Sequence, residues 1–221
     1  MSYDGVLLDN DGVLTAITDP TVLRRAVTNA FSDMGVIDPD PEDVTALTIG
    51  VTPDLLDWVT DRYDLDPGSF WRRRDLHSSL IQERELLAGR KPLYEDVDAL
   101  DEISVPIGVV SSNQHRTIET ILEYYGLSDR IRTYYGREPI TESLTWKKPH
   151  TEYLDRAIAD LGVSNPLFVG DSQSDVEAAA AAGVDSVFLR RAHRAETELA
   201  VPATYEIESL TDLPDLVRPA G

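Results

Sequence analysis

The sequence predicts an α/β fold in which a parallel sheet, with helices on both faces, carries a small all-helical insert after its first strand. From about residue 92 onward, short apolar segments alternate with amphipathic helical patterns. This alternation is typical of parallel strands joined by crossover helices. Residues 15–89 carry helical patterns only, and an apolar strand precedes them. We therefore expect a core formed by residues 1–14 and 90–221 and a helical cap domain formed by residues 15–89.

Each expected element follows from a local pattern. The first strand is the apolar run Val6–Leu8. Within the insert, prolines that can begin helices punctuate the amphipathic segments, which span 21–34, 41–47, 52–63 and 69–87. In the chain after the insert, apolar runs predict strands at 106–111, 130–136, 166–171, 185–190 and 204–207. Apolar residues three and four apart predict the intervening helices at 115–127, 150–162, 174–183 and 210–217.

The charge balance argues against two classes of partner. The chain of 221 residues has 40 acidic and 20 basic side chains and a formal net charge of −20. Nucleic acids and anionic membranes need a basic patch, so we expect neither as a partner. Lys91, Lys147 and Lys148 are the only lysines, and the other basic residues are arginines. Because dense counterions screen the self-repulsion of such a surface, the composition favours a halophilic source over an ordinary acidic protein.

The composition also indicates a soluble, cytoplasmic protein. There is no cysteine, which leaves neither disulfides nor thiolate chemistry. The N-terminal sequence lacks the basic and apolar pattern of a signal peptide. No apolar run approaches the ~20 residues of a membrane span. We expect a monomer or a homodimer.

Polar residues follow several of the expected strands. Asp9 and Asp11 come after the first strand, Ser111 ends the second, and Asp171 ends a later one. Taken singly, these residues have ordinary explanations: an Asp-Gly turn, a hydroxyl that caps a turn, or caps of the following helix. In a parallel sheet, however, the carboxyl ends of the strands share one edge, which is where such sheets bind ligands. We therefore expect these side chains to meet.

If these side chains lie close together, the arrangement would suit phosphate chemistry. Asp9, Asp171 and Asp175 would supply the hard oxygen ligands that Mg²⁺ prefers, and a cation would relieve the repulsion among them. Lys148 and Ser111 would hold phosphate oxygens. A lone lysine is usually a solvated surface residue, but this chain uses arginine for most of its cations.

Two carboxylates would then share the reaction. Asp9 would attack phosphorus and form an aspartyl phosphate. Asp11 would protonate the leaving oxygen and later deprotonate the attacking water. Hydrolysis of a phosphate monoester needs up to ~10²¹-fold acceleration, and a nucleophile, a metal and an acid–base group together provide a route to it.

Four segments, in this order and over nearly the whole chain, resemble the motifs of the haloacid dehalogenase-like superfamily. The run DNDGVL at residues 9–14 is similar to the first motif, and Ser111 to the second. Lys148, directly before a proline, is similar to the third motif, and the run GDSQSD at residues 170–175 to the fourth. The resemblance implies a Rossmann-like core with an inserted helical cap.

The resemblance also implies roles for the motif residues. It makes Asp9 the nucleophile and a magnesium ligand. It makes Asp11 the general acid–base, with a backbone carbonyl that also binds the metal. Lys148 would steady the nucleophile and the phosphate, Asp171 would bind the metal directly, and Asp175 would bind it directly or act through a neighbouring ligand.

The chain departs from the family pattern in its second motif. Ser111 and Asn113 are separated by Ser112, where the family often places Thr and Asn side by side. All three, together with Lys148, are therefore candidates for phosphate binding. In the first motif, the dehalogenases themselves lack the second aspartate, so Asp11 favours phosphoryl transfer over carbon–halogen hydrolysis.

The insert is expected to select the substrate, because it leaves the core beside the first motif and can cover it like a lid. Four polar residues on one expected helix could meet a polar or anionic leaving group: Arg72, Arg73, Arg74 and His77. The alternative is a solvated basic face on an acidic protein.

The implied function is a Mg²⁺-dependent phosphatase that hydrolyses a small-molecule phosphate monoester, similar to phosphoglycolate phosphatases, through an aspartyl phosphate. A sugar phosphomutase of the same superfamily, similar to β-phosphoglucomutase, would use the same core but return the phosphoryl group to the substrate. A phospho-acceptor receiver-type signalling module would also group acids, a hydroxyl and a lysine. Such a module needs no insert of about 75 residues, and it gives Asp11 no acid–base task.

Overall fold

The computed structural model describes residues 3–217, and the predicted α/β class is confirmed. Six strands form one sheet in the order β3-β2-β1-β4-β5-β6, and every neighbouring pair is parallel. The strands are β1 (Gly5–Leu8), β2 (Ile107–Gln114), β3 (Ile131–Arg137), β4 (Pro166–Gly170), β5 (Asp185–Leu189) and β6 (Tyr205–Ile207). β1 is central, and its Leu8 pairs with Val109 of β2 and Val169 of β4.

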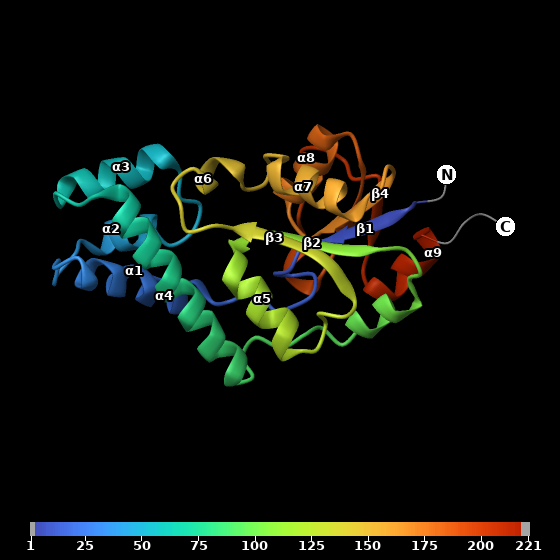
Figure 1. Cartoon of the computed structure of the whole chain (residues 1–221), viewed down its shortest axis with the longest axis horizontal. Helices are drawn as coiled ribbons and strands as arrows, with labels where there is room; N and C mark the ends of the chain where they lie inside the picture. The colour runs from blue at the N-terminus through green and yellow to red at the C-terminus, as the bar shows by residue number, and fades with distance from the viewer. Residues whose placement is uncertain (1–2, 218–221) are drawn as a thin grey trace.

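Both faces of the sheet are buried, because successive side chains of a strand point to opposite sides. In β1, Val6 and Leu8 join one hydrophobic cluster and Leu7 joins another. Figure 1 shows helices on the two sides of the sheet. The first cluster packs against α5 (His115–Tyr124), α9 (Leu213–Val217) and the 3₁₀ segments η1 (Val97–Glu102) and η3 (Leu210–Asp212). The second packs against α7 (Glu152–Leu161) and α8 (Gln173–Ala182).

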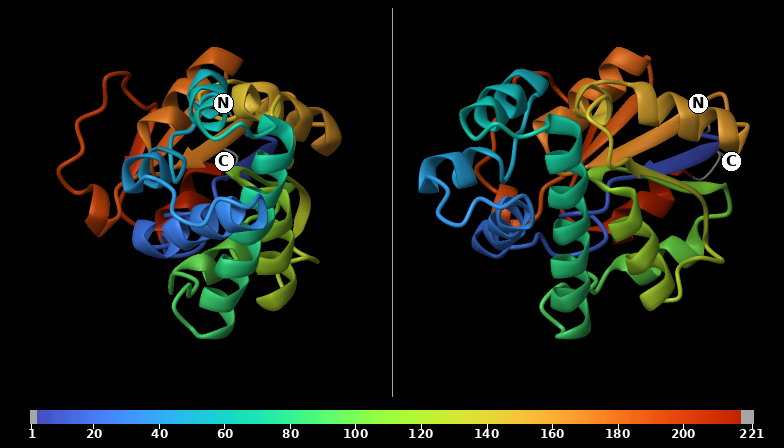
Figure 2. Two further views of the ribbon diagram at one scale, coloured as in Figure 1. Left: turned by 90° about the vertical axis from the view of Figure 1, so that its left-hand side faces the viewer. Right: turned by 60° about the vertical axis from the view of Figure 1, so that its left-hand side comes forward.

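Four helices between β1 and β2 gather beyond one end of the sheet, as Figure 1 and Figure 2 show. They are α1 (Pro20–Asp33), α2 (Pro41–Ala46), α3 (Pro53–Arg62) and α4 (Pro67–Leu87). Each begins with a proline, whose fixed φ suits the first helical turn, and the side chain of the preceding residue caps each one. These helices share a hydrophobic cluster that is distinct from those of the sheet.

The helix α4 connects this helical group to the sheet. It packs against α1 and also against α5 and β2, and Figure 2 shows it standing beside α5. Because the strands are parallel, their carboxyl ends lie at one edge, which faces the helical group in Figure 1. The residues that follow the strands are therefore positioned between the sheet and α4.

The structure adds a few short segments to the predicted elements. Strand β2 continues beyond the expected end at Ser111 to Gln114. The segments α6 (Ser143–Trp146) and η2 (Ala192–Arg194) are too short to give a periodic signal, and the last predicted helix begins as the 3₁₀ turn η3. No helix within residues 3–217 is long and apolar enough to cross a bilayer.

Candidate active site

Asp9 lies at the carboxyl end of β1. Its backbone N–H donates to the Val169 carbonyl at 2.9 Å, which extends the pairing of β1 with β4. The residue is only 7% exposed. Its Oδ1 accepts from Asn10 N at 2.7 Å and lies 2.9 Å from Lys148 Nζ. The strand thus brings a buried carboxylate to a lysine from a distant part of the chain.

Lys148 joins two of the predicted carboxylates. Its ammonium contacts Asp9 and Asp175 and donates to the Val110 carbonyl at 3.2 Å. Burial opposes the charge of Lys148, but Asp175 and Asp9 outweigh burial and raise its pKa above the usual value. The lysine is therefore held charged beside Asp9, as binding of a phosphate oxygen requires.

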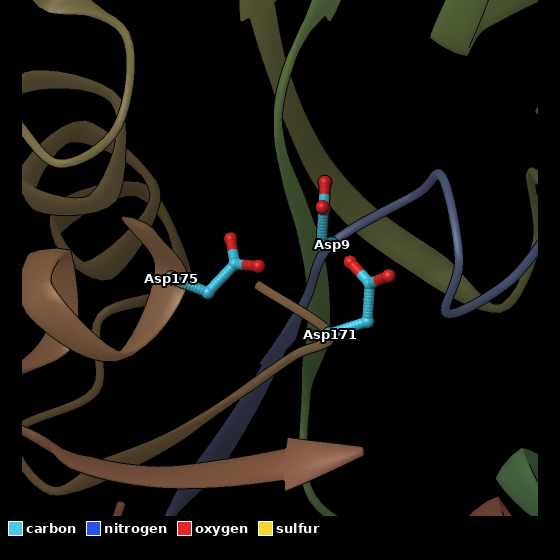
Figure 3. Close-up of side chains that lie close together, drawn as sticks. All are labelled: Asp9, Asp171 and Asp175. Carbon is cyan, nitrogen blue, oxygen red and sulfur yellow. The ribbon is translucent and has the colours of Figure 1, made fainter. Parts of the chain in front are cut away.

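Asp9, Asp171 and Asp175 form a buried carboxylate group. Each offers an oxygen within 4.8 Å of the others, and Figure 3 shows the three side chains extending into a common space. Burial raises the pKa of Asp9 to about 7; Lys148 acts against this shift, and the carboxylates of Asp175 and Asp171 add to it. Three oxygen donors that repel one another fit a hard divalent cation such as Mg²⁺.

Two glycines allow the close approach of backbone to these acids. Gly12 has φ +83°, and a Cβ at this position would overlap the carboxylate of Asp171. A Cβ on Gly170 would overlap the side chain of Asp175. That side chain also caps α8, because its Oδ2 accepts from Ser172 N at 2.9 Å. The glycines of the first and fourth motifs are therefore required by the packing of the site.

Asp171 has two basic neighbours that the sequence analysis did not single out. His193 Nε2 lies 2.7 Å from Asp171 Oδ2, and Arg194 Nε donates to the same oxygen at 3.1 Å. Both residues belong to the short segment η2 after β5. Arg194 therefore balances part of the negative charge of the carboxylate group.

Asp11 lies outside the carboxylate group. Lys91 contacts its Oδ1, and Asn113 Nδ2 donates to its Oδ2 at 2.7 Å. Lys91 is 1% exposed and also donates to the Ala16 carbonyl at 3.0 Å. Burial opposes the charge of Asp11, but Lys91 and Asn113 outweigh burial and lower its pKa. Asp11 therefore rests as the base, and both of its oxygens are oriented by hydrogen bonds.

The three phosphate-binding candidates of β2 have different surroundings. Ser111 is buried, and its Oγ accepts from Asn113 N at 3.2 Å. Ser112 is half-buried and lines a cavity next to α4. Asn113 holds Asp11 and exchanges two hydrogen bonds of 2.9 Å with Gln82 of α4. Asn113 therefore ties the acid–base candidate to the helical group, whereas Ser111 supports the backbone of the strand end.

Of the four candidate residues on α4, Arg74 faces the site. It lines a cavity of ≈ 280 Å³ that residues of the first and second motifs also line. Arg73 and His77 instead lie 3.7 Å and 2.8 Å from Asp33 of α1, and Arg72 lines a different pocket. Successive helical residues are turned by about 100°, so consecutive arginines point in different directions. The geometry therefore favours Arg74 over Arg72, Arg73 and His77 as the residue that meets a leaving group.

The sequence analysis did not place Lys91, Gln82, Arg137 or His193 in the site. A signal for Lys91 was available: lysine is scarce in this chain, and all of its lysines contact Asp9, contact Asp11 or line the cavity. The other three lie on segments whose position relative to the strand ends depends on tertiary packing. Their local sequence therefore carried no signal.

Comparison with known proteins agrees with this geometry. The profile of the haloacid dehalogenase-like hydrolase family matches residues 4–189. A phosphoglycolate phosphatase of Yersinia pestis is 28% identical over 200 residues, which cover 84% of this chain and 80% of that protein. A phosphoglycolate phosphatase of Pseudomonas syringae pv. tomato is 28% identical over 238 residues, which cover 98% of this chain and 85% of that protein.

Solved structures share the fold. CbbY from Rhodobacter sphaeroides, determined in complex with phosphate, has a TM-score of 0.70 at 18% identity and covers 96% of each chain. A hydrolase of the same superfamily from Geobacter sulfurreducens has a TM-score of 0.58 at 22% identity, covering 98% of this chain and 97% of that chain. The family profile spans most of the sequence, so the expected enzyme class is confirmed. The chain belongs to the haloacid dehalogenase-like hydrolase family.

Proposed function

We propose that the protein is a Mg²⁺-dependent phosphatase that hydrolyses a small-molecule phosphate monoester through an aspartyl-phosphate intermediate. The strongest support is the meeting of Asp9 with Lys148 and two further carboxylates at one edge of the sheet. Relatives named phosphoglycolate phosphatase support the same reaction class.

In the first proposed step, an oxygen of Asp9 attacks phosphorus and the ester oxygen leaves. Burial raises the pKa of Asp9, whereas Lys148 acts against this shift and favours the ionised form that attacks. Lys148 and the Ser111 hydroxyl would hold the phosphate oxygens. When bound by Asp9, Asp171 and the Asp11 carbonyl, Mg²⁺ would supply positive charge to the carboxylates and the phosphate.

Asp11 would move the protons of both steps. It would donate one to the leaving oxygen and later take one from the water that attacks the aspartyl phosphate. Lys91 and Asn113 lower its pKa, which favours the base form required in the second step. The first step requires the protonated form, so Asp11 would have to gain a proton when the substrate binds.

Residues 15–89 would act as the cap of this site. They include α4, whose Gln82 hydrogen bonds to Asn113 beside Asp11. A cap joined to the acid–base residue in this way would exclude water from the reacting phosphate when it closes.

The test is the release of inorganic phosphate from a panel of small phosphate esters, with Mg²⁺ or with EDTA, at low and at molar KCl. We expect release with Mg²⁺ and only background release in EDTA. The two salt levels test the halophilic expectation in the same experiment. An Asp9→Asn preparation reports any contaminating phosphatase, and acid quenching during turnover tests for a phosphorylated chain. Isomerisation of a hexose phosphate without phosphate release would identify the phosphomutase instead, and no turnover of any ester would contradict the proposal.

A further inference from the structure

The cavity next to α4 joins Asp11 to two buried cations and a half-buried one. Asp11 and Asn113 line it on the side of the first and second motifs. Arg74 of α4, Arg137 at the end of β3 and Lys147 before the third motif also line it. A leaving group that receives a proton from Asp11 must extend into a space that Asp11 borders. The leaving group would therefore share this cavity with the three cations, which we call the cation cluster.

The cation cluster is not neutralised by the protein. Asp75 Oδ1 accepts from Arg74 Nη1 at 3.0 Å, and its two oxygens accept from Arg137 at 2.7 and 3.0 Å. Lys147 donates to the Val51 carbonyl and pairs with no carboxylate among residues 3–217. Three positive charges therefore share one negative charge, in a protein whose net charge is −20.

The electrostatics of the cavity indicate the same deficit of negative charge. Burial lowers the pKa of Arg74 to about 10; Asp75 acts against this shift and Arg137 adds to it. Burial, Arg137 and Arg74 also lower the pKa of Lys147. A bound anion would reverse these shifts, because it would stabilise the charged forms.

Two further polar groups of the cavity have no hydrogen-bond partner among residues 3–217. Trp71 Nε1 and Ser78 Oγ are buried without a hydrogen bond among the described residues, and both residues line the cavity. Unpaired buried polar groups cost free energy, and ligand atoms can satisfy them. The guanidinium carbons of Arg74 and Arg137 lie 4.9 Å and 4.6 Å from the centre of the Trp71 ring, which fixes both cations at this end of the cavity.

The helix α4 runs between two ends of the cavity, one lined by Asp11 and the other by the cation cluster. Arg74, Ser78 and Gln82 line the cavity at intervals of four residues. Gln82 is at the end that holds Asn113 and Asp11, and Arg74 is two intervals away. At 1.5 Å per residue this separation is about 12 Å along the helix axis. Arg74 is also held at its end, because its Nε donates to the Leu47 carbonyl at 3.2 Å. Between these ends lies the side chain of Gln114, which contacts Gln82 Nε2 at 2.9 Å and Asp75 Oδ1 at 3.4 Å, so a leaving group beside Asp11 must extend past it to reach the cation cluster.

Resting on the phosphatase function proposed above, we propose that the cation cluster of Arg74, Arg137 and Lys147 binds a second anionic group, a carboxylate or a phosphate, at the far end of an elongated substrate. The substrate class is then a phosphate monoester of a five- or six-carbon chain that ends in an anion. Trp71 and Ser78 donate hydrogen bonds to polar atoms of that chain or of its terminal group.

The test compares esters that differ at the far end. 6-Phosphogluconate and sorbitol 6-phosphate are open chains of equal length with an anionic and a neutral end. Fructose 1,6-bisphosphate and fructose 6-phosphate repeat the comparison with a phosphate, and 2-phosphoglycolate presents a carboxylate at short range. We expect kcat/KM to be at least about tenfold higher for the ester with the anionic far end than for its neutral partner in one or both pairs, because charge-assisted hydrogen bonds are among the stronger ones.

Variants assign the preference to the cation cluster. Lys147→Gln should lower the ratio of kcat/KM between the charged and the neutral ester severalfold, mainly through KM of the charged one. Arg73→Gln, on the same helix as Arg74 but outside the cavity, is the matched control and should keep the parent ratio. Arg74→Gln, combined with Asp75→Asn to avoid a buried unpaired carboxylate, should lower the ratio further, with thermal unfolding as the folding check.

Binding to Asp9→Asn protein, measured by calorimetry, separates this inference from the proposed function. Tighter binding of 6-phosphogluconate or of fructose 1,6-bisphosphate than of its neutral partner supports the anion subsite even if the parent protein hydrolyses neither ester. Equal binding within both pairs would overturn it, even in an active phosphatase. A preference for 2-phosphoglycolate over both longer anionic esters, or an equal response of Lys147→Gln and Arg73→Gln, would also overturn it.

Discussion

The two sides of the active site carry opposite charge. At the strand ends, the carboxylate group surrounds a single lysine, Lys148. Beside α4, the cation cluster shares a single carboxylate, Asp75. A cation would complete the first, negative side, and an anion would complete the second, positive side. Under the proposed function, the chemistry and the choice of substrate would therefore depend on separate charge imbalances, which can be altered one at a time.

The largest effect should follow from neutralising Asp9, because the change removes the proposed nucleophile from the negative side. Asp9→Asn is expected to lower kcat by at least about 10³-fold while the protein stays folded. Phosphate release measures the loss of kcat, and the circular dichroism spectrum shows whether the protein stays folded. Ordinary turnover in this variant would refute the nucleophile assignment.

Asp11→Asn tests the group that borders both sides. We expect kcat to fall by about 10²-fold or more, because both proton transfers would lose the proposed acid–base group. Rapid-quench measurements should find that formation and breakdown of the phosphorylated chain are both slower. Since the change leaves the buried Lys91 without its carboxylate, thermal unfolding is measured in parallel. Nearly unchanged turnover would rule out the acid–base role.

Gly12→Ala breaks the geometry of the negative side without removing a charge. A Cβ at this position would meet Asp171 at a φ of +83°, so we expect a loss of about 3 kcal/mol in the free energy of unfolding. Gly35→Ala is the matched control, because its φ is +87° but nothing lies within 4 Å of the new Cβ. That variant should lose only about 1 kcal/mol. Urea unfolding measures both, and equal losses would contradict the close packing of Gly12 against Asp171.

We also expect a pH dependence of stability in the metal-free protein. Burial and the neighbouring carboxylates raise the pKa of Asp9 to about 7 in the folded state, above a value of about 4 for an unfolded chain. Between these values the folded state binds a proton that the unfolded state has released. The contribution of Asp9 is therefore complete below about pH 4 and is lost as the pH rises through about 7.

Urea unfolding in EDTA at several pH values measures this contribution. The free energy of unfolding of the parent should fall, relative to that of Asp9→Asn, as the pH rises from about 4 to about 7. Mg²⁺ should restore more stability to the parent at pH 8 than at pH 5. Parallel curves for the two proteins would show that Asp9 is not protonated in the folded, metal-free state.

The negative side of the site could be predicted from the sequence, because parallel strands end at one edge. An apolar strand that stops at Asp9 and another that stops at Asp171 sufficed to bring both acids together. Asp175 lies in the first turn of α8, which begins two residues after Asp171, so the two acids stay close together. Lys148 was expected beside these acids because lysine is scarce in this chain, and the family resemblance supported that assignment.

The positive side could not be predicted, because it depends on how α4 is rotated about its axis. Several of the buried residues of α4 are polar. Its sequence therefore lacks the usual contrast between an apolar, buried face and a polar, exposed face. The run Arg72–Arg74 therefore gave no sign of which arginine enters the cavity. Arg137 lies directly after the predicted strand at 130–136 and was given no role, and its pairing with Asp75 depends on the packing of α4 against the sheet.

The burial of the lysines has a practical consequence for work with this protein. Lys91 and Lys148 are buried, and Lys147 is half-buried in the wall of the cavity. Reagents that modify amines therefore find few of their usual targets on the outer surface. Acylation or reductive methylation of a lysine would report on the interior of the enzyme, and protection by a bound ligand would map its occupancy. Coupling to a sensor chip through guanidinium or carboxyl chemistry avoids this interference.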